Sequence, residues 1–100
     1  MVQEIIWSPH ALKDYLNVIL YLQENWTVNE IDKFVNRVDE KIDILREHPH
    51  LGSIKSKKMN VRKTIIHDSV ILIYKYRPIK KEIILVHFWN TRQNKFSSIR

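Results

Sequence analysis

The sequence of 100 residues contains no cysteine and only one glycine. The absence of cysteine excludes disulfide bonds, thiol catalysis and thiolate zinc sites, and a single glycine excludes the glycine-rich loops that cradle phosphates. No apolar run reaches the roughly 18 residues that a membrane-spanning helix needs. The N-terminal segment lacks the basic flank and long apolar core of a signal peptide. We therefore expect one domain over residues 1–100, in the cytoplasm and without a membrane partner.

Acidic residues are scarce in the second half of the chain. Residues 1–50 carry 5 Lys and Arg against 9 Asp and Glu, whereas residues 51–100 carry 12 Lys and Arg against 2 Asp and Glu. The formal net charge of +6 therefore hides an acidic half and a basic half. A basic half favours binding to a polyanion or to an acidic protein partner. An uneven, merely solvated surface would have the same composition.

A first helix is predicted to follow Ser8-Pro9. The apolar residues over 3–7 are typical of a short strand, which Pro9 ends, and Ser8 suits the N-cap of the helix that begins there. Apolar residues then recur at intervals of three and four, which places them on one helical face. This stripe consists of Leu12, Tyr15, Ile19, Leu22 and Trp26, widened by Leu16 and Leu20.

A second helix is predicted to begin at Thr27, which forms a capping box with Glu30, and to end at His48, because Pro49 disfavours further helix. Its apolar stripe consists of Val28, Ile31, Val35, Val38, Ile42 and Leu45. Almost nothing separates the two helices, so we expect an antiparallel hairpin. A coiled-coil dimer is the other way to bury two such stripes.

Three β-rich runs occupy the second half, at 61–66, 70–77 and 82–89. The short turns between them predict an antiparallel meander. The lysine-rich segment 53–60 is typical of a mobile loop or a short irregular strand, and the polar residues 90–100 of a short helix or a loose tail. The two helices and the sheet must bury their apolar sides together, so the expected fold class is α+β with the order β-α-α-β-β-β.

Histidine occurs five times, and none of its spacings indicates a metal site. His48 and His50 lie two apart across a proline with no accompanying carboxylate motif, so exposed loop histidines are the better interpretation. His67, Asp68 and Ser69 have turn propensities, and the nucleophile elbow of a triad hydrolase is missing. We therefore expect no metal and no cofactor.

The basic half offers side chains that suit nucleic acid. We expect a concave sheet face that carries Arg62, His87, Trp89 and Arg92, beside the loop lysines Lys55, Lys57 and Lys58. Strand alternation places His87 on the side of Leu85 and Trp89. Arg and Lys contact phosphates, and aromatic rings stack on single-stranded bases, so such a face could hold an RNA backbone. Core packing near a strand end would equally explain His87 and Trp89, and a surface ion pair would explain Arg62.

Five segments carry a further pattern, and together they span nearly the whole chain. They are W-S-P-H-A-L-K-D-Y-L at 7–16, L-R-E-H-P-H-L-G at 45–52, V-R at 61–62, I-L-I-Y-K-Y at 71–76 and I-I-L-V-H-F-W-N-T-R-Q-N at 83–94. In this order the segments resemble the RelE/ParE superfamily of toxins from bacterial type II toxin–antitoxin systems. The resemblance implies the same β-α-α-β-β-β fold. It also implies a small basic toxin, associated with plasmid stabilization and growth inhibition, that a cognate acidic antitoxin neutralises.

The superfamily has two activities, because RelE-like members cleave mRNA in the ribosomal A site and ParE-like members poison DNA gyrase. By resemblance, Arg62 matches the catalytic strand Arg of the nucleases, Arg92 approximates a second Arg, and His87 could serve as acid or base. Lys55, Lys57 and Lys58 fall in the region of the nucleases' loop lysines. The nucleases' C-terminal Tyr, or His-Tyr pair, is replaced by a segment with Phe96, whose phenyl ring cannot transfer a proton.

We therefore expect a toxin that acts as the ParE-like members do, by inhibiting gyrase, because an inhibitory binder needs no catalytic residues. A ribosome-dependent mRNA endonuclease is the alternative, and an inactive member that only binds the antitoxin is a third. The basic half should attract an acidic, partly disordered antitoxin segment that folds on binding as a helix or an added strand.

Overall fold

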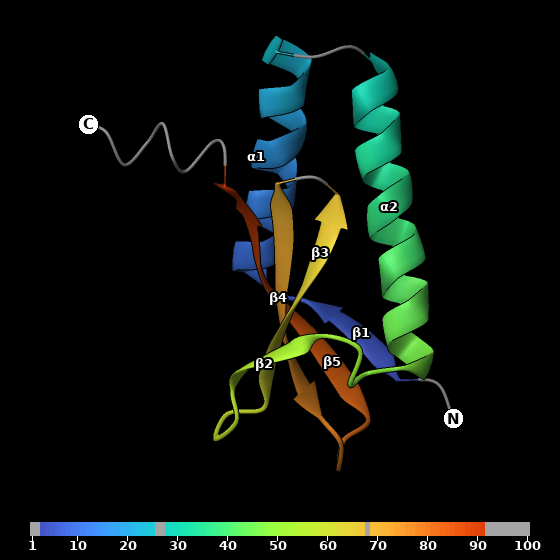
Figure 1. Cartoon of the computed structure of the whole chain (residues 1–100), viewed down its shortest axis with the longest axis vertical. Helices are drawn as coiled ribbons and strands as arrows, with labels where there is room; N and C mark the ends of the chain where they lie inside the picture. The colour runs from blue at the N-terminus through green and yellow to red at the C-terminus, as the bar shows by residue number, and fades with distance from the viewer. Residues whose placement is uncertain (1–2, 26–27, 68, 92–100) are drawn as a thin grey trace, which may run out of the picture.

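Five strands form one mixed sheet, and two helices connect its first strand to the remaining four (Figure 1). The computed structural model describes residues 3–25, 28–67 and 69–91. The elements in chain order are β1 (Glu4–Trp7), α1 (Pro9–Asn25), α2 (Val28–Glu47), β2 (Ser53–Ser56), β3 (Val61–His67), β4 (Val70–Arg77) and β5 (Glu82–Asn90). The predicted α+β fold with the order β-α-α-β-β-β is confirmed, and β2 adds an edge strand to it.

The spatial order of the strands is β1-β5-β4-β3-β2. Strands β2 to β5 are antiparallel neighbours, which includes the predicted meander, and β1 lies parallel to β5 at one edge. For the segment 53–60 the short irregular strand is the correct alternative, since β2 pairs with β3 through a register shift. Residues 92–100 lie outside the described residues, so the short helix or loose tail expected there stays a prediction.

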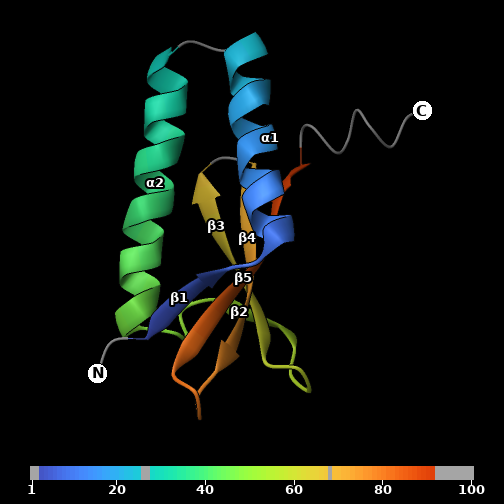
Figure 2. The same cartoon turned by 180° about the vertical axis from the view of Figure 1, so that it is seen from behind.

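The two helices run antiparallel, as their short connection predicts, and Figure 1 and Figure 2 both show them side by side. Ser8 is the N-cap of α1, because its Oγ accepts a hydrogen bond from the Ala11 N–H at 3.0 Å. Trp26 and Thr27, predicted as a stripe residue and a capping residue, lie outside the described residues. Neither of the described helices is long and apolar enough to cross a membrane.

The face of α1 that meets the core is predicted correctly for Tyr15, Ile19 and Leu22, but not for Leu12, Leu16 and Leu20. The residues of α1 in or against the core are Ala11, Tyr15, Val18, Ile19 and Leu22. Leu12, Leu16 and Leu20 are instead about half exposed, at 48%, 50% and 54%. The assignment of Leu12 to the buried stripe is therefore wrong. Two lines of apolar residues with helical spacing run along α1. Only the line that includes Ala11 is buried in the core, and the line that begins at Leu12 is exposed.

On α2 the buried residues are Phe34, Val38, Ile42 and Leu45. Three of these confirm the predicted stripe, whereas Phe34 was not part of it. Val28, predicted to begin the stripe, is 72% exposed. It lies in the first turn of α2, which extends past the ends of the strands in Figure 1, so the sheet cannot cover it.

Strand register decides which side chains share a face of the sheet. Arg62 lies opposite Tyr74, whereas His87 lies opposite Ile73, the preceding residue of β4. Successive residues of a strand point to opposite faces, so Arg62 and His87 lie on opposite faces. A register shift after Ile73 also places Tyr74 opposite Leu85. The expectation that Leu85 and His87 share a side is therefore wrong, because an extra residue between them interrupts the alternation.

Candidate functional site

Arg62 binds the loop that connects α2 to β2. Its Nη1 donates hydrogen bonds to the Gly52 carbonyl oxygen at 2.9 Å and to the His50 carbonyl oxygen at 3.3 Å. Its Nε is buried and meets no acceptor among the residues that the structure describes. The guanidinium thus ties β3 to this loop, and the surface ion pair considered for Arg62 does not form with any described residue.

Tyr74 holds the same loop from the neighbouring strand. Its hydroxyl donates to the Pro49 carbonyl oxygen at 2.9 Å and accepts a hydrogen bond from the Gly52 N–H at 2.9 Å. A Cβ at Gly52 would lie 2.7 Å from the Lys63 carbonyl oxygen and 2.8 Å from the Tyr74 hydroxyl. Burial raises the pKa of the Tyr74 phenol, although the Gly52 N–H and the charge of Arg62 act to lower it. The segment from Pro49 to Gly52 is therefore held against β3 and β4. A glycine is required at position 52 because a side chain there would overlap the Lys63 carbonyl oxygen and the Tyr74 hydroxyl.

His87 on β5 lies against the first two turns of α1. Its Nδ1 is hydrogen-bonded with Asp14 Oδ2, and the same oxygen accepts a hydrogen bond from the Phe88 N–H at 3.2 Å. His10 Nε2 lies 3.1 Å from His87 Nδ1 and 3.3 Å from Asp14 Oδ2. Sequence reasoning missed this cluster. The spacing of four between His10 and Asp14 on a predicted helix placed them on one face, but no local pattern indicated their third partner.

Trp89 lies beside His87, with their ring centroids 5.9 Å apart. Its side chain is 41% exposed, so core packing does not account for it. It lies opposite Ile71, which in turn lies opposite Ile65 on β3, and Ile65 is 63% exposed. His87 and Trp89 are thus brought together as expected, on the face of the sheet that Arg62 does not share.

The single concave face expected to hold Arg62, His87, Trp89 and Arg92 is therefore wrong for the first three residues. The reason is the register of β3 and β5 against β4, which no alternation within one strand can reveal. Arg92 lies outside the described residues. The individual roles suggested for these side chains stay predictions.

The loop lysines lie at one end of the sheet. Lys55 is in β2, and Lys57 and Lys58 are in the turn that follows, all three exposed. The β4–β5 turn lies at the same end, as the pairing of Val61 with Lys75 requires and as Figure 1 shows. We call this end the basic end. It comprises Lys55, Lys57, Lys58, Lys75, Arg77, Lys80 and Lys81.

Few acidic residues of the second half of the chain accompany the basic end. Glu4 of β1 also lies at this end, because it pairs with Glu82. Arg77 pairs with Glu82, with 3.7 Å between Nη1 and Oε1, and residues 51–90 contain only one other acidic residue, Asp68. Many of the basic residues in the second half of the sequence therefore also lie together in space, at the basic end. The cations gather at the end of the sheet and around its hairpins rather than on the whole face opposite the helices. Such a surface favours phosphate or an acidic protein segment.

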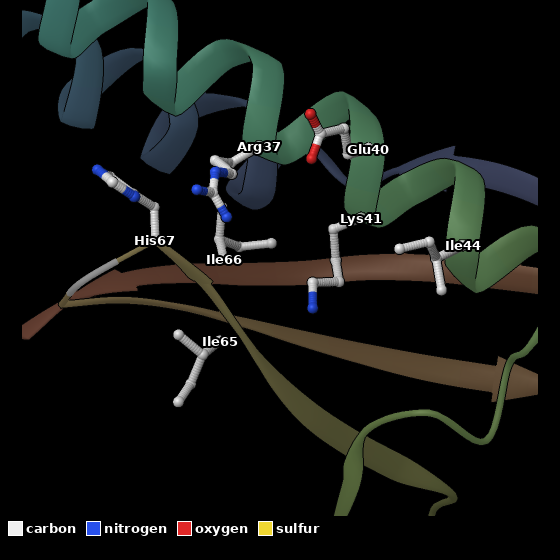
Figure 3. A pocket seen from close by; sticks show the side chains of 7 residues that line it. All are labelled: Arg37, Glu40, Lys41, Ile44, Ile65, Ile66 and His67. Carbon is white, nitrogen blue, oxygen red and sulfur yellow. The ribbon is translucent and has the colours of Figure 1, made fainter.

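A groove of about 360 Å³ lies between α2 and the end of β3 (Figure 3). Lys41 extends from α2 toward the strands, Ile66 points toward α2, and Ile65 points away from it. At one end of the groove His67 Nε2 lies 3.9 Å from Glu30 Oε2. The groove mixes both charges with apolar side chains, and nothing in the sequence predicted it.

Comparisons with known proteins agree with this architecture. The family model described as "ParE toxin of type II toxin-antitoxin system, parDE" matches residues 5–95. No curated protein matches the sequence. A solved structure described as "Chromosomal ParDE TA system from P. aeruginosa" is similar with a TM-score of 0.71 and 14% identity, over 89% of this chain and 96% of that one.

Two structures from Staphylococcus aureus are also similar, each with 20% identity over 87% of this chain and 94% of theirs. One is a YoeB dimer, with a TM-score of 0.60. The other is a heterotetrameric YoeB-YefM toxin-antitoxin complex, with a TM-score of 0.57. At these identities the similarity establishes a shared fold.

Proposed function

Because the chain belongs to the family of ParE toxins of type II toxin–antitoxin systems, we propose that it inhibits DNA gyrase in the cytoplasm and is neutralised by a cognate antitoxin. The observation that carries the choice of target is the environment of Arg62. This arginine is the side chain on which a nuclease of the superfamily would depend, and its Nη1 is already bonded to two loop carbonyls.

Cleavage of RNA at a ribose 2′-OH needs acid–base groups and positive charge that converge on one phosphate. Among the described candidates, Arg62 faces the α2–β2 loop, and His87 is engaged with Asp14 on the other face of the sheet. Two groups on opposite faces cannot act on the same phosphate. This separation, together with Phe96 in place of an ionisable ring, favours an inhibitory binder over the endonuclease.

The basic end is the proposed surface for the target. Lys55, Lys57 and Lys58 are exposed on β2 and its turn. Gyrase works on DNA, so a cationic surface can approach either the enzyme's acidic regions or the bound DNA backbone. In this proposal the lysines contribute affinity and association rate, and no bond is made or broken by this chain.

The antitoxin is proposed to cover the exposed leucines of α1. Leu12, Leu16 and Leu20 lie one turn apart and are each about half exposed, which makes a continuous apolar line on one side of the helix. An amphipathic segment that folds on binding can bury such a line with its own apolar residues. Acidic residues of the same segment would be attracted to the basic half of the chain.

The deciding experiment compares both targets with one preparation of the chain. We expect inhibited supercoiling and accumulated gyrase–DNA cleavage product, relieved by the antitoxin, and no ribosome-dependent mRNA cleavage in a translation extract. Ribosome-dependent cleavage that Arg62→Ala abolishes would establish the endonuclease instead. Antitoxin binding without either activity, and without growth arrest on induced expression, would establish the inactive member.

A further inference from the structure

Three ligand atoms from α1 and β5 converge on one point, away from the basic end. They are His10 Nε2, Asp14 Oδ2 and His87 Nδ1, all within 4.8 Å of one another. Within the described residues this is the one group of three or more His, Asp or Glu side chains arranged so. The atoms come from positions 73 and 77 residues apart in the sequence, so the fold itself assembles the group.

The chemistry of these atoms requires a proton or a cation between them. An imidazole nitrogen that lacks its proton and a carboxylate oxygen both present lone pairs, and lone pairs that face each other at about 3 Å repel unless a proton or a cation lies between them. Imidazole nitrogen and carboxylate oxygen are both ligands of Zn²⁺. Two histidines and one carboxylate are also the protein ligands of several open zinc sites.

Two of the three spacings between the ligand atoms suit tetrahedral zinc. Bonds of about 2.0–2.1 Å at tetrahedral angles separate neighbouring ligand atoms by roughly 3.3 Å. His10 Nε2 lies 3.3 Å from Asp14 Oδ2 and 3.1 Å from His87 Nδ1. His87 Nδ1 and Asp14 Oδ2 lie closer together than this spacing, so these two side chains must move apart to accept an ion.

The surroundings support Asp14 and leave one side open. The Phe88 N–H donates to Asp14 Oδ2, which orients the carboxylate as outer hydrogen bonds do in metal sites. The Asp14 and His87 side chains are 14% and 28% exposed, whereas that of His10 is 64% exposed. An ion can therefore enter past His10, and a water molecule can take the fourth position.

We propose that His10, Asp14 and His87 form a binding site for a divalent transition metal ion with the ligand preferences of zinc. The site is independent of the proposed target and departs from the expectation that the chain binds no metal. A bound ion would cross-link α1 to β5. Since the three ligands meet only in the folded chain, binding would stabilise the fold as the ion concentration rises.

The test uses the untagged full chain after removal of metals with a chelator. Zn²⁺ binding is measured by competition with a chelating dye, Co²⁺ binding by its visible absorption, and folding stability by the thermal midpoint. We expect saturable binding of one ion per chain and a midpoint that rises with zinc concentration. Tetrahedral Co²⁺ absorption would identify the coordination.

Two ligand variants and one control make the result specific. His10→Gln and His87→Gln should each weaken binding at least tenfold, on the order of the loss that even outer-shell changes cause, and should abolish the zinc-dependent midpoint shift. The double variant His48→Gln/His50→Gln removes exposed loop histidines and should bind as the unaltered chain does. His10 is the most exposed ligand, so His10→Gln decides the test if His87→Gln does not fold.

The proposal is overturned if the unaltered chain shows no saturable Zn²⁺ binding. It is equally overturned if His10→Gln binds Zn²⁺ as tightly as the unaltered chain, or if the loop-histidine control loses binding to the same extent. None of these readouts depends on toxicity, so the result stands whichever target the chain has.

Discussion

Arg62 and Gly52 are joined by a 2.9 Å hydrogen bond from the guanidinium Nη1 to the glycine carbonyl oxygen. Gly52 is held from its other side as well, because its N–H donates to the Tyr74 hydroxyl at 2.9 Å. Side chains of two neighbouring strands, β3 and β4, thus form hydrogen bonds with the same residue of the loop after α2. The arginine on which a nuclease interpretation depends therefore has a structural role that is open to direct measurement.

Replacement of Arg62 by Ala should lower the free energy of unfolding by about 1.5 kcal/mol, because a charged donor to two carbonyls is lost. Urea denaturation measures this change. Gyrase inhibition per folded molecule should fall less than tenfold. Ribosome-dependent mRNA cleavage that falls on the order of 10²–10³ with unchanged stability, typical of removing a group that stabilises transition-state charge, would contradict the structural role.

Gly52→Ala should destabilise the chain by roughly 1–3 kcal/mol, because the added methyl group would overlap the Lys63 carbonyl oxygen and the Tyr74 hydroxyl. The midpoint of urea denaturation is the measurement. The neighbouring change Ser53→Ala, at an exposed position, is the control and should alter stability by no more than about 0.5 kcal/mol. Equal midpoints for the two variants would show that the loop relaxes freely.

Tyr74→Phe should cost about 1–3 kcal/mol of folding stability, because the Pro49 carbonyl and the Gly52 N–H both lose their partner in a buried place. Tyr76→Phe is the matched control, since that tyrosine is also buried and its hydroxyl makes no hydrogen bond in the described part of the chain. Thermal unfolding compares the two. A smaller loss for Tyr74→Phe than for the control would refute the bridging role.

Alkaline pH should destabilise the fold through two tyrosines. Burial raises the pKa of Tyr15 and Tyr74 above the ordinary value of 10.0, and the nearby charge of Asp39 raises that of Tyr15 further. Because the folded-state pKa is the higher one, the stability from the neutral phenols is fully present below pH 10 and is lost as the pH rises through the folded-state value. Denaturation midpoints across this range should fall, and less steeply for Tyr15→Phe. A flat profile would oppose this prediction.

Leu16→Glu should weaken antitoxin binding at least about tenfold, because it places a charge in the middle of the exposed leucine line of α1. The side chain is half exposed, so folding should change little. Ile79→Glu, at a position that is 97% exposed in the β4–β5 turn, is the matched control. Affinity is measured by titration with the purified antitoxin. Unchanged affinity of Leu16→Glu would place the antitoxin on another surface.

Local sequence signals were sufficient for the elements and their order. The Ser8 cap, the apolar periods of the helices and the β-rich runs each depend on residues close together in the chain, and each was recovered in the structure. The choice of buried face on α1 could not be made from local signals alone. Leu12 and Ala11 both begin lines with helical spacing on α1, and only contact with the sheet and α2 distinguishes them.

The sequence by itself determined the element order, the basic second half and the superfamily pattern, because caps, periodicity and charge are properties of neighbouring residues. Only the tertiary structure decided that Arg62 meets Gly52, that His10 and Asp14 meet His87, and that Arg62 and His87 face opposite ways. These relationships depend on strand register and on where α1 rests against β5. Such contacts join positions up to 77 residues apart. They are determined by the packing of the whole core and not by the preferences of neighbouring residues.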